Sequence, residues 1–186
     1  MRTFVAVPVN DAVRGKLSGM LTLLSAAAPR VRWVRPENLH ITLKFLGDVP
    51  PQDLDELFSA LTDAITETAP FTLEVAGLGA FPRVSAPRVA WAGIGEGAEE
   101  LSALAGKTET ACAALGYEPE ARPYRPHLTL GRARIPSDMA DAAALLTKCA
   151  KDSFGVIDVD EAVVYMSELR KSGPVYSPMA RIPLGG

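Results

Sequence analysis

Both histidines of this chain begin the same four-residue pattern. His40 is followed by Ile-Thr-Leu, and His127 is followed by Leu-Thr-Leu. An imidazole has an ordinary pKa of about 6.5, so it can both give and take a proton near neutral pH. Two imidazoles in matching contexts therefore predict an acid and a base that act on one substrate.

The threonines belong to the same pattern, because residues two apart in a β-strand point to the same face. His40 and Thr42 are expected together on one face, as are His127 and Thr129, while the apolar residues between them anchor each strand in the core. The hydroxyls can donate to phosphoryl oxygens, where negative charge accumulates. Displacement at phosphorus needs a base on one side and an acid on the other. We therefore predict phosphoryl chemistry at these four residues, with no metal and no cofactor.

Arginines surround both motifs, and Arg125 and Arg132 are the candidates for contacts with the phosphate of a substrate. Counting by twos from Leu128 points Arg132 towards the core, so a strand end or a bulge would have to turn it towards the substrate. Solvated surface arginines are the alternative. The same counting places Phe45 in the core rather than in a base-stacking position.

The composition favours one folded unit over residues 1–186, because 48% of the residues are apolar and 22% are charged. A net charge of −3 disfavours a protein that coats long nucleic acids, but it leaves a small or terminal substrate open. Cys112 and Cys149 are expected to be buried free thiols, since their spacing suits neither a disulfide framework nor a zinc site. The sequence shows no secretion signal and no membrane span, so we expect a cytoplasmic protein.

Hydrophobic periodicity and turn signals predict alternating strands and helices. Strands are expected at residues 4–9, 31–34, 39–46, 71–76, 88–92, 127–132, 156–166 and 175–182. Helices are expected at residues 11–28, 52–68 and 98–115, and from a cap at Ser137 to about residue 151. The second half echoes the first, which predicts two α/β lobes related by an approximate two-fold, with the motif strands facing each other across a groove.

The motif sequences resemble the 2H phosphoesterase superfamily. His-Ile-Thr-Leu-Lys-Phe-Leu-Gly at residues 40–47 and Arg-Pro-His-Leu-Thr-Leu-Gly-Arg at residues 125–132 are similar to its RNA 2′,3′-cyclic phosphodiesterase branch, historically called 2′-5′ RNA ligase. The likeness includes the opening Arg-Thr-Phe-Val-Ala-Val-Pro and a late stretch with Tyr165, Ser167, Gly173 and Tyr176. It therefore spans nearly the whole chain.

The resemblance implies a bilobal α+β fold in which antiparallel sheets line a central cleft and helices lie outside. It implies a hydrolase that opens the 2′,3′-cyclic phosphate at an RNA end to a 2′-phosphomonoester. His40 would be the proton donor and His127 the proton acceptor, an assignment that belongs to the family. The reverse reaction would join tRNA fragments through a 2′-5′ bond. We expect a monomer.

Two alternatives stay open at this point. One is a 2H enzyme that acts on another cyclic phosphate or on 2′-5′ oligonucleotides. The other is a non-catalytic module that binds RNA ends and keeps the cleft without turnover.

Overall fold

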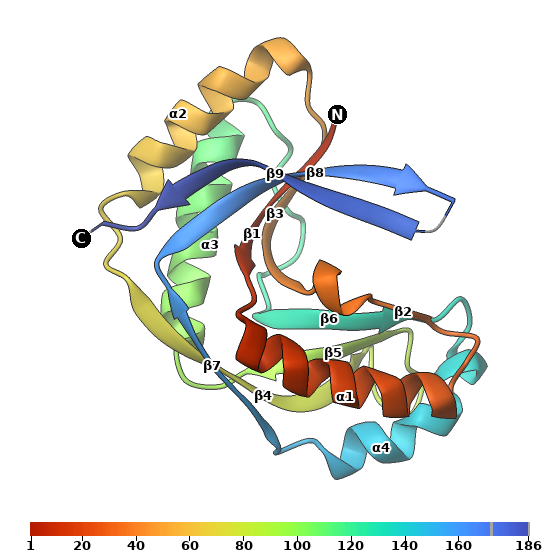
Figure 1. The fold of residues 1–186 in the computed structure, drawn as a ribbon. Coiled ribbons are helices and arrows are strands. Elements are labelled where there is room, and N and C mark those ends of the chain that lie inside the picture. Colours follow the sequence, from red (N-terminus) through yellow and green to blue (C-terminus); the bar gives the residue numbers. More distant parts are fainter. Residues whose placement is uncertain (172, 186) are drawn as a thin grey trace.

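The computed structural model describes residues 1–171 and 173–185, and within them nine strands form two antiparallel sheets accompanied by four α-helices (Figure 1). One sheet has four strands and the other has five. Three short 3₁₀ turns lie at Pro36–Asn38, Pro51–Asp53 and Pro136–Ala142.

The four-stranded sheet has the order β3-β1-β8-β9, formed by His40–Asp48, Arg2–Pro8, Glu161–Arg170 and Gly173–Pro183. Two helices pack against it: α2 (Leu54–Ile65) contacts β9, and α3 (Ala98–Ala114) contacts β3. This sheet therefore joins strands from the beginning and from the end of the chain.

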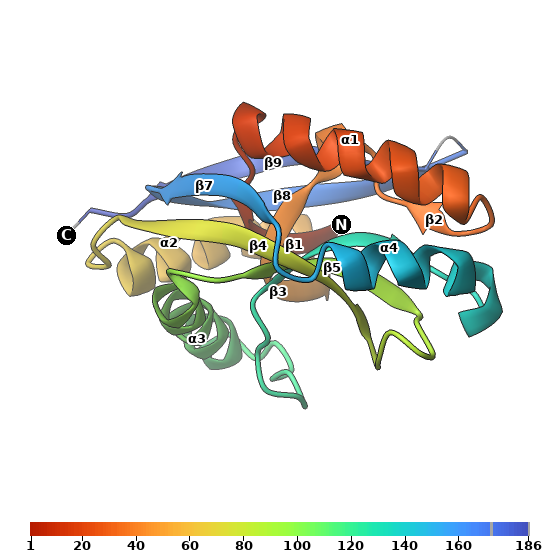
Figure 2. The same ribbon diagram turned by 90° about the horizontal axis from the view of Figure 1, so that it is seen from below.

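The five-stranded sheet has the order β2-β6-β5-β4-β7, formed by Arg32–Trp33, His127–Arg132, Val89–Ile94, Phe71–Phe81 and Ser153–Val159. The helix α1 (Asp11–Ala27) contacts β7, and α4 (Ala143–Lys148) contacts β4. Figure 2 shows α1 and α4 on one side of the molecule and α3 on the other. The helix α3 also contacts β4, so it touches both sheets.

A side-chain cap and an apolar face explain why α1 forms where it does. Asn10 caps its N-terminus, because its side-chain oxygen accepts a hydrogen bond from the backbone N–H of Val13 at 2.9 Å. The buried residues Val13, Leu17, Leu21 and Leu24 recur at helical spacing and form the face that packs on the five-stranded sheet. No helix among the described residues is long and apolar enough to cross a membrane.

The motif strands are anchored as the alternation predicted. Ile41, Leu43, Leu128 and Leu130 are buried in the hydrophobic core, while the histidines and threonines between them remain partly exposed. The α+β class and the antiparallel sheets are confirmed, as are the two buried free cysteines. The central cleft between the lobes stays a prediction.

One predicted strand is wrong. The strand expected over residues 156–166 is two strands, β7 and β8, which meet at Asp160 and belong to different sheets. The apolar residues on both sides of Asp160 are buried, so local hydrophobicity carries no sign that the chain changes sheets there.

The predicted cap at Ser137 is also wrong. The segment begins as a 3₁₀ turn at Pro136 after Ile135, makes no side-chain cap, and becomes α4 only at Ala143. Proline has no N–H to lose at a first helical position, and its fixed φ suits that position. The segment therefore starts before Ser137, and its α-helical part ends at Lys148.

Candidate active site

The motif strands β3 and β6 contact each other, although they belong to different sheets. A hydrogen bond from the Tyr124 hydroxyl to the backbone oxygen of Thr42, 2.9 Å long, ties the segment before β6 to the centre of the first motif. The backbone N–H of Val34 donates to the oxygen of Leu130 at 2.8 Å on the other side of β6. The Tyr124 hydrogen bond and the contacts between β3 and β6 therefore hold the two motifs in one region.

Each motif strand has the same irregularity at the fourth residue of its motif. In β3, Thr42 pairs with Ala6 and Lys44 pairs with Val5, so Leu43 is an extra residue in the register. In β6, Leu130 is the extra residue, because the partners on β5 shift by one between Thr129 and Gly131. A bulge of this kind turns the following side chains to the opposite face.

The bulges determine which of the following side chains are buried and which are exposed. Lys44 and Gly131 are both buried, and the next positions, Phe45 and Arg132, are both exposed. The bulge that was needed to turn Arg132 away from the core is thus present in β6. The placement of Phe45 in the core is wrong: the side chain is 55% exposed, because the period of two is interrupted at Leu43.

The two imidazoles are oriented by the same contact. The Nδ1 atom of His40 lies 2.8 Å from the backbone oxygen of Asn38, and Nδ1 of His127 lies 2.7 Å from that of Arg125. A carbonyl oxygen only accepts, so Nδ1 carries the proton in both rings. Nε2 is then left to face a substrate in each case. Asn38 is itself fixed, since its side chain donates to the oxygen of Pro174 at 2.9 Å.

Burial and neighbouring charge lower the pKa of both histidines. Desolvation is the largest cause in each, and the carbonyl bonds oppose it in part. The positive charge of Arg132 lowers the pKa of both His40 and His127, and His127 further lowers that of His40. Arg132 therefore lies within electrostatic reach of both rings.

The motif threonines have unused hydroxyls. Across residues 1–171 and 173–185, the side-chain oxygens of Thr42 and Thr129 make no hydrogen bond with another residue, and both side chains are partly exposed. They share a strand face with the neighbouring imidazole. Each can donate to a ligand that enters between the motifs.

The remaining basic candidates divide into two kinds. Arg125 is exposed, and its guanidinium lies over the ring of Phe81, 5.7 Å from the ring centroid. Lys44 is buried and is held by the Glu109 carboxylate at 2.9 Å and the Glu118 backbone oxygen at 2.7 Å. Arg125 can therefore reach a ligand, whereas Lys44 ties β3 to α3 and to the segment leading to β6.

Aromatic rings surround both histidines, and the motif analysis did not identify them as site residues. Phe4 and Tyr176 pack against the ring of His40 with centroid separations of 4.7 and 5.3 Å. The ring of Phe81 meets His127 edge-on at 5.2 Å. These contacts form between residues far apart in sequence, so only Phe4 and Tyr176, through the family resemblance, carried any sequence signal.

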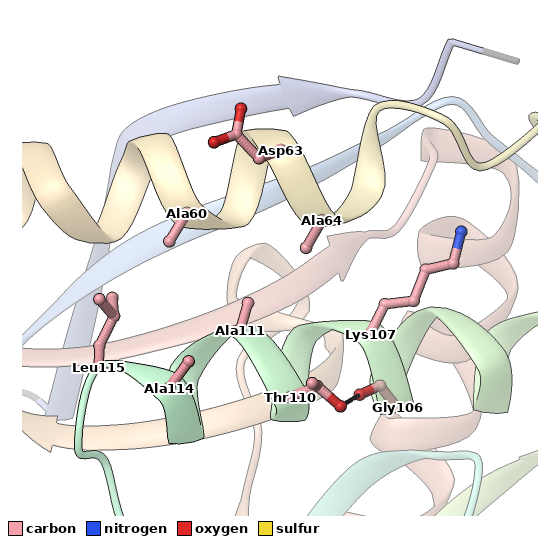
Figure 3. Close-up of a pocket in the computed structure, with 9 residues that line it drawn as sticks. All are labelled: Ala60, Asp63, Ala64, Gly106, Lys107, Thr110, Ala111, Ala114 and Leu115. Atoms are coloured by element: carbon pink, nitrogen blue, oxygen red, sulfur yellow. Dashed lines mark hydrogen bonds between the residues drawn. The ribbon is translucent and has the colours of Figure 1, made fainter.

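A groove of about 620 Å³ lies between α2 and α3 (Figure 3). Its walls are small side chains such as Ala60, Ala64 and Ala111, with Asp63 and Lys107 at the edges, and none of the motif residues lines it. No group of three or more metal-binding side chains occurs in the part of the chain that the structure describes. The chemistry-bearing residues thus gather at the motif strands and not at this groove.

The sequence matches known proteins over nearly its whole length. Residues 7–91 and 94–176 match the family model described as LigT like Phosphoesterase. An RNA 2′,3′-cyclic phosphodiesterase of Methanothermobacter thermautotrophicus is 35% identical over 179 residues, which cover 96% of each chain. A protein of the same description from Archaeoglobus fulgidus is 36% identical over 96% of this chain and 98% of its own.

Solved structures show the same fold. A crystal structure of a Thermus thermophilus protein superposes with a TM-score of 0.81 at 28% identity, covering 100% of this chain and 99% of the other. The crystal structure of E. coli LigT complexed with 3′-AMP superposes with a TM-score of 0.79 at 25% identity, covering 98% of this chain and 97% of the other.

Proposed function

Because this chain belongs to the LigT-like phosphoesterases of the 2H superfamily, we propose that it hydrolyses the 2′,3′-cyclic phosphate at an RNA end to a 2′-phosphomonoester. The relatives described as RNA 2′,3′-cyclic phosphodiesterases support this substrate. The observation that carries the proposal is the pair of imidazoles that bond through Nδ1 to a backbone carbonyl and share the charge of Arg132.

In the proposed reaction, a water oxygen attacks the phosphorus and the bond from phosphorus to O3′ breaks. Neutral His127 accepts a proton from the water at Nε2, and protonated His40 donates its Nε2 proton to O3′. The product has a 2′-phosphate and a 3′-hydroxyl, and a second pair of proton transfers restores both rings. The family supplies the assignment of donor and acceptor, since the two histidines have the same backbone contact.

Charge at the phosphoryl group would be stabilised by the motif threonines and the arginines. Thr42 and Thr129 have hydroxyls without another partner, so they can donate to the two non-bridging oxygens. The exposed guanidinium groups of Arg132 and Arg125 add positive charge beside the motifs. The two imidazoles carry the proton transfers, so we propose that no metal or cofactor takes part.

The direct test is turnover of a short synthetic RNA that ends in a 2′,3′-cyclic phosphate. Product analysis by chromatography against 2′-phosphate and 3′-phosphate standards should find only the 2′-phosphate. The variants His40→Ala and His127→Ala should each lose about 10²- to 10⁴-fold in kcat. Only 3′-phosphate product would overturn the assignment of bond cleavage.

The same assay decides between the proposal and its two rivals. A panel that includes nucleoside 2′,3′-cyclic phosphates, ADP-ribose cyclic phosphate and 2′-5′ oligonucleotides would reveal another 2H activity. Equal, negligible rates for the wild type and both histidine variants, with retained binding of the RNA end, would indicate a binding module. Turnover that EDTA abolishes would contradict a metal-free mechanism.

We propose that the same groups can also join two RNAs, which is the reverse of cleaving a 2′-5′ linkage to a cyclic phosphate. If the 5′-hydroxyl of a second RNA takes the place of water, its oxygen attacks the phosphorus and the bond from phosphorus to O3′ breaks. His127 takes the proton of that hydroxyl, His40 protonates O3′, and the product has a 2′-5′ linkage and a free 3′-hydroxyl. We propose tRNA fragments with cyclic phosphate and 5′-hydroxyl ends as the substrates for this joining. Incubation of such halves at high concentration, followed by sequencing across the junction, tests it.

We also propose that residues 1–186 act as one domain of two interlocked lobes and as a monomer. The support is the chain path, since β7 ends in one sheet and β8 begins in the other at Asp160. Light scattering coupled to gel filtration should give the mass of a single chain, 19.7 kDa. The cytoplasmic location stays a prediction.

A further inference from the structure

Two aromatic side chains border the second motif on the face that carries its histidine and threonine. Trp91 on β5 lies directly opposite Thr129 on β6, and Phe81 ends the neighbouring strand β4. Their rings are 5.3 Å apart with a tilt of 36°, and Phe81 also meets His127. Directly opposite residues on paired strands have Cβ atoms about 4.5–5.5 Å apart. The aromatic surface therefore begins one side chain away from the proposed phosphate position.

Two glycines allow the indole to lie down on the sheet. A Cβ atom at Gly79 would be 2.3 Å from Cζ2 of Trp91, and one at Gly93 would be 3.2 Å from its Cζ3. The indole thus occupies the space above these backbones that side chains would otherwise fill. Trp91 and Phe81 both remain partly exposed, so the surface that they form is open to a ligand.

The indole of Trp91 also carries a cost in free energy at this position. Its Nε1 is buried and has no hydrogen-bond partner among the described residues. A buried donor without a partner costs about 1–3 kcal/mol. A side chain that only filled this space would avoid the cost as phenylalanine or leucine. What tryptophan adds at this position is the largest flat π-surface of any side chain.

Flat aromatic surfaces beside an arginine are the chemistry that holds single-stranded nucleic acid bases. The guanidinium of Arg125 lies over Phe81 at the edge of this surface. We propose that Trp91 and Phe81 form the subsite on which the terminal nucleobase of the substrate stacks, with Arg125 at its rim. The base is attached to the same ribose that bears the cyclic phosphate. This inference rests on the proposed function.

Phe4, the ring closest to His40, does not offer an equivalent surface. Phe4 is only 3% exposed, and it packs at once against His40, Tyr165 and Tyr176. Its faces are therefore occupied by other rings. The base is therefore placed on the side of His127, where the two rings adjoin the guanidinium of Arg125.

The kinetic test compares adenosine 2′,3′-cyclic phosphate with the methyl riboside 2′,3′-cyclic phosphate, which lacks a base. The wild type should favour the nucleoside by about 10-fold in kcat/KM, within the range of one base stacked on an aromatic side chain. In Trp91→Leu this ratio should fall towards one, mostly through KM, and in Trp91→Phe it should fall less. Equal kcat/KM for the two substrates in the wild type would overturn the subsite.

A matched control is available because the chain has two tryptophans. Trp33 also packs over a glycine, Gly131, but its Nε1 donates to the backbone oxygen of Ala28 at the end of α1. Trp33→Phe should keep the wild-type ratio between the two substrates. If this variant lost the ratio as fully as Trp91→Leu, the preference would not come from stacking on Trp91.

A binding measurement separates the subsite from the proposed reaction. Trp33→Phe leaves Trp91 as the one indole, so adenosine 2′-monophosphate should quench its fluorescence, whereas ribose 2-phosphate should not. Quenching without hydrolysis by the wild type would uphold the subsite and contradict the proposed function. Unchanged fluorescence at saturating adenosine 2′-monophosphate, with binding verified by calorimetry, would overturn the subsite whatever the activity.

Discussion

The two motif strands share a backbone design and differ in what they place around it. Both have a histidine held through Nδ1, a threonine hydroxyl without a hydrogen-bond partner among the described residues, and a bulge at the fourth residue. After the bulge, β3 continues with a buried lysine and an exposed Phe45, whereas β6 continues with a buried glycine and an exposed Arg132. The repeat thus preserves the reactive pair, while the following residues supply internal anchoring from β3 and positive charge from β6.

The aromatic residues around the two histidines also differ. His40 is enclosed by the packed rings of Phe4 and Tyr176, and His127 borders the open surface of Phe81 and Trp91. One motif is built into a packed aromatic cluster, and the other borders two partly exposed rings. Symmetry of the reactive groups therefore coexists with asymmetry of their aromatic surroundings.

The largest expected effect tests the shared part of this comparison. His40→Ala and His127→Ala should each lower kcat by about 10²- to 10⁴-fold, and the double variant should lose little more, because either ring alone cannot complete the reaction. Rapid-quench or steady-state assays on the cyclic-phosphate RNA would measure this. If the kcat values of the two single variants differed by orders of magnitude, the two histidines would not contribute equally to the reaction.

The threonines should give smaller and similar losses. Thr42→Val and Thr129→Val keep the shape of the side chain but remove the donor, and a hydrogen bond to a charged group is worth about 10- to 100-fold in rate. Thr22→Val on the exposed surface of α1 is the control and should leave kcat unchanged. A loss confined to one threonine would mean that only one motif contacts the phosphoryl oxygens.

Lys44 tests the anchoring role of β3. Its side chain is 1% exposed and that of Glu109 is 28% exposed. Lys44→Met should lower the free energy of unfolding by about 2 kcal/mol, less than the roughly 3–5 kcal/mol of a fully buried pair, because the remaining carboxylate can be hydrated. Urea denaturation would measure it.

The control for Lys44 is the surface ion pair of Arg170 and Glu168, whose side chains are 61% and 45% exposed. Arg170→Met should change stability by less than about 1 kcal/mol. An equally small change for Lys44→Met would contradict the anchoring role.

Arg132 gives the smallest change in rate and the most specific change in pH dependence. Turnover needs one histidine protonated and the other neutral, so kcat/KM should peak midway between their pKa values. Burial and Arg132 lower the pKa of both rings, which puts the wild-type peak below about pH 6.5. Arg132→Gln removes a positive charge, so both pKa values rise and the peak should move to higher pH.

The loss of rate in Arg132→Gln should be about 10-fold, because the arginine is exposed and water screens its charge. Arg134→Gln, two residues further on, should keep the wild-type pH profile. A peak that stays in place in Arg132→Gln would exclude the electrostatic link between the arginine and the histidines.

Much of the site follows from local pattern. The period of two placed Ile41, Leu43, Leu128 and Leu130 in the core and left the histidines and threonines on the other face, because burial in a strand depends on neighbours in sequence. The same rule gave the wrong answer for Phe45. A bulge is set by pairing with another strand, here Val5 and Ala6 of β1, and this pairing is not encoded within the strand itself.

Pairing between distant strands also explains the two other features that were not predicted from the sequence. The change of sheet at Asp160 depends on which strands are already in place beside β7 and β8. The surface of Phe81 and Trp91 forms only when β4, β5 and β6 align and the two glycines lie under the indole. Neither feature has a signature in a short stretch of sequence.

The membership of the four-stranded sheet has a consequence for how the chain is made. β1 lies between β3, its neighbour early in the sequence, and β8, which begins at Glu161. On a translating ribosome, one edge of β1 must wait, unpaired, until the chain has been synthesised as far as β8. Sequence-distant pairing slows folding, and waiting strand edges invite association with other chains. Newly made chains should therefore depend on chaperones most heavily in the interval before β8 emerges.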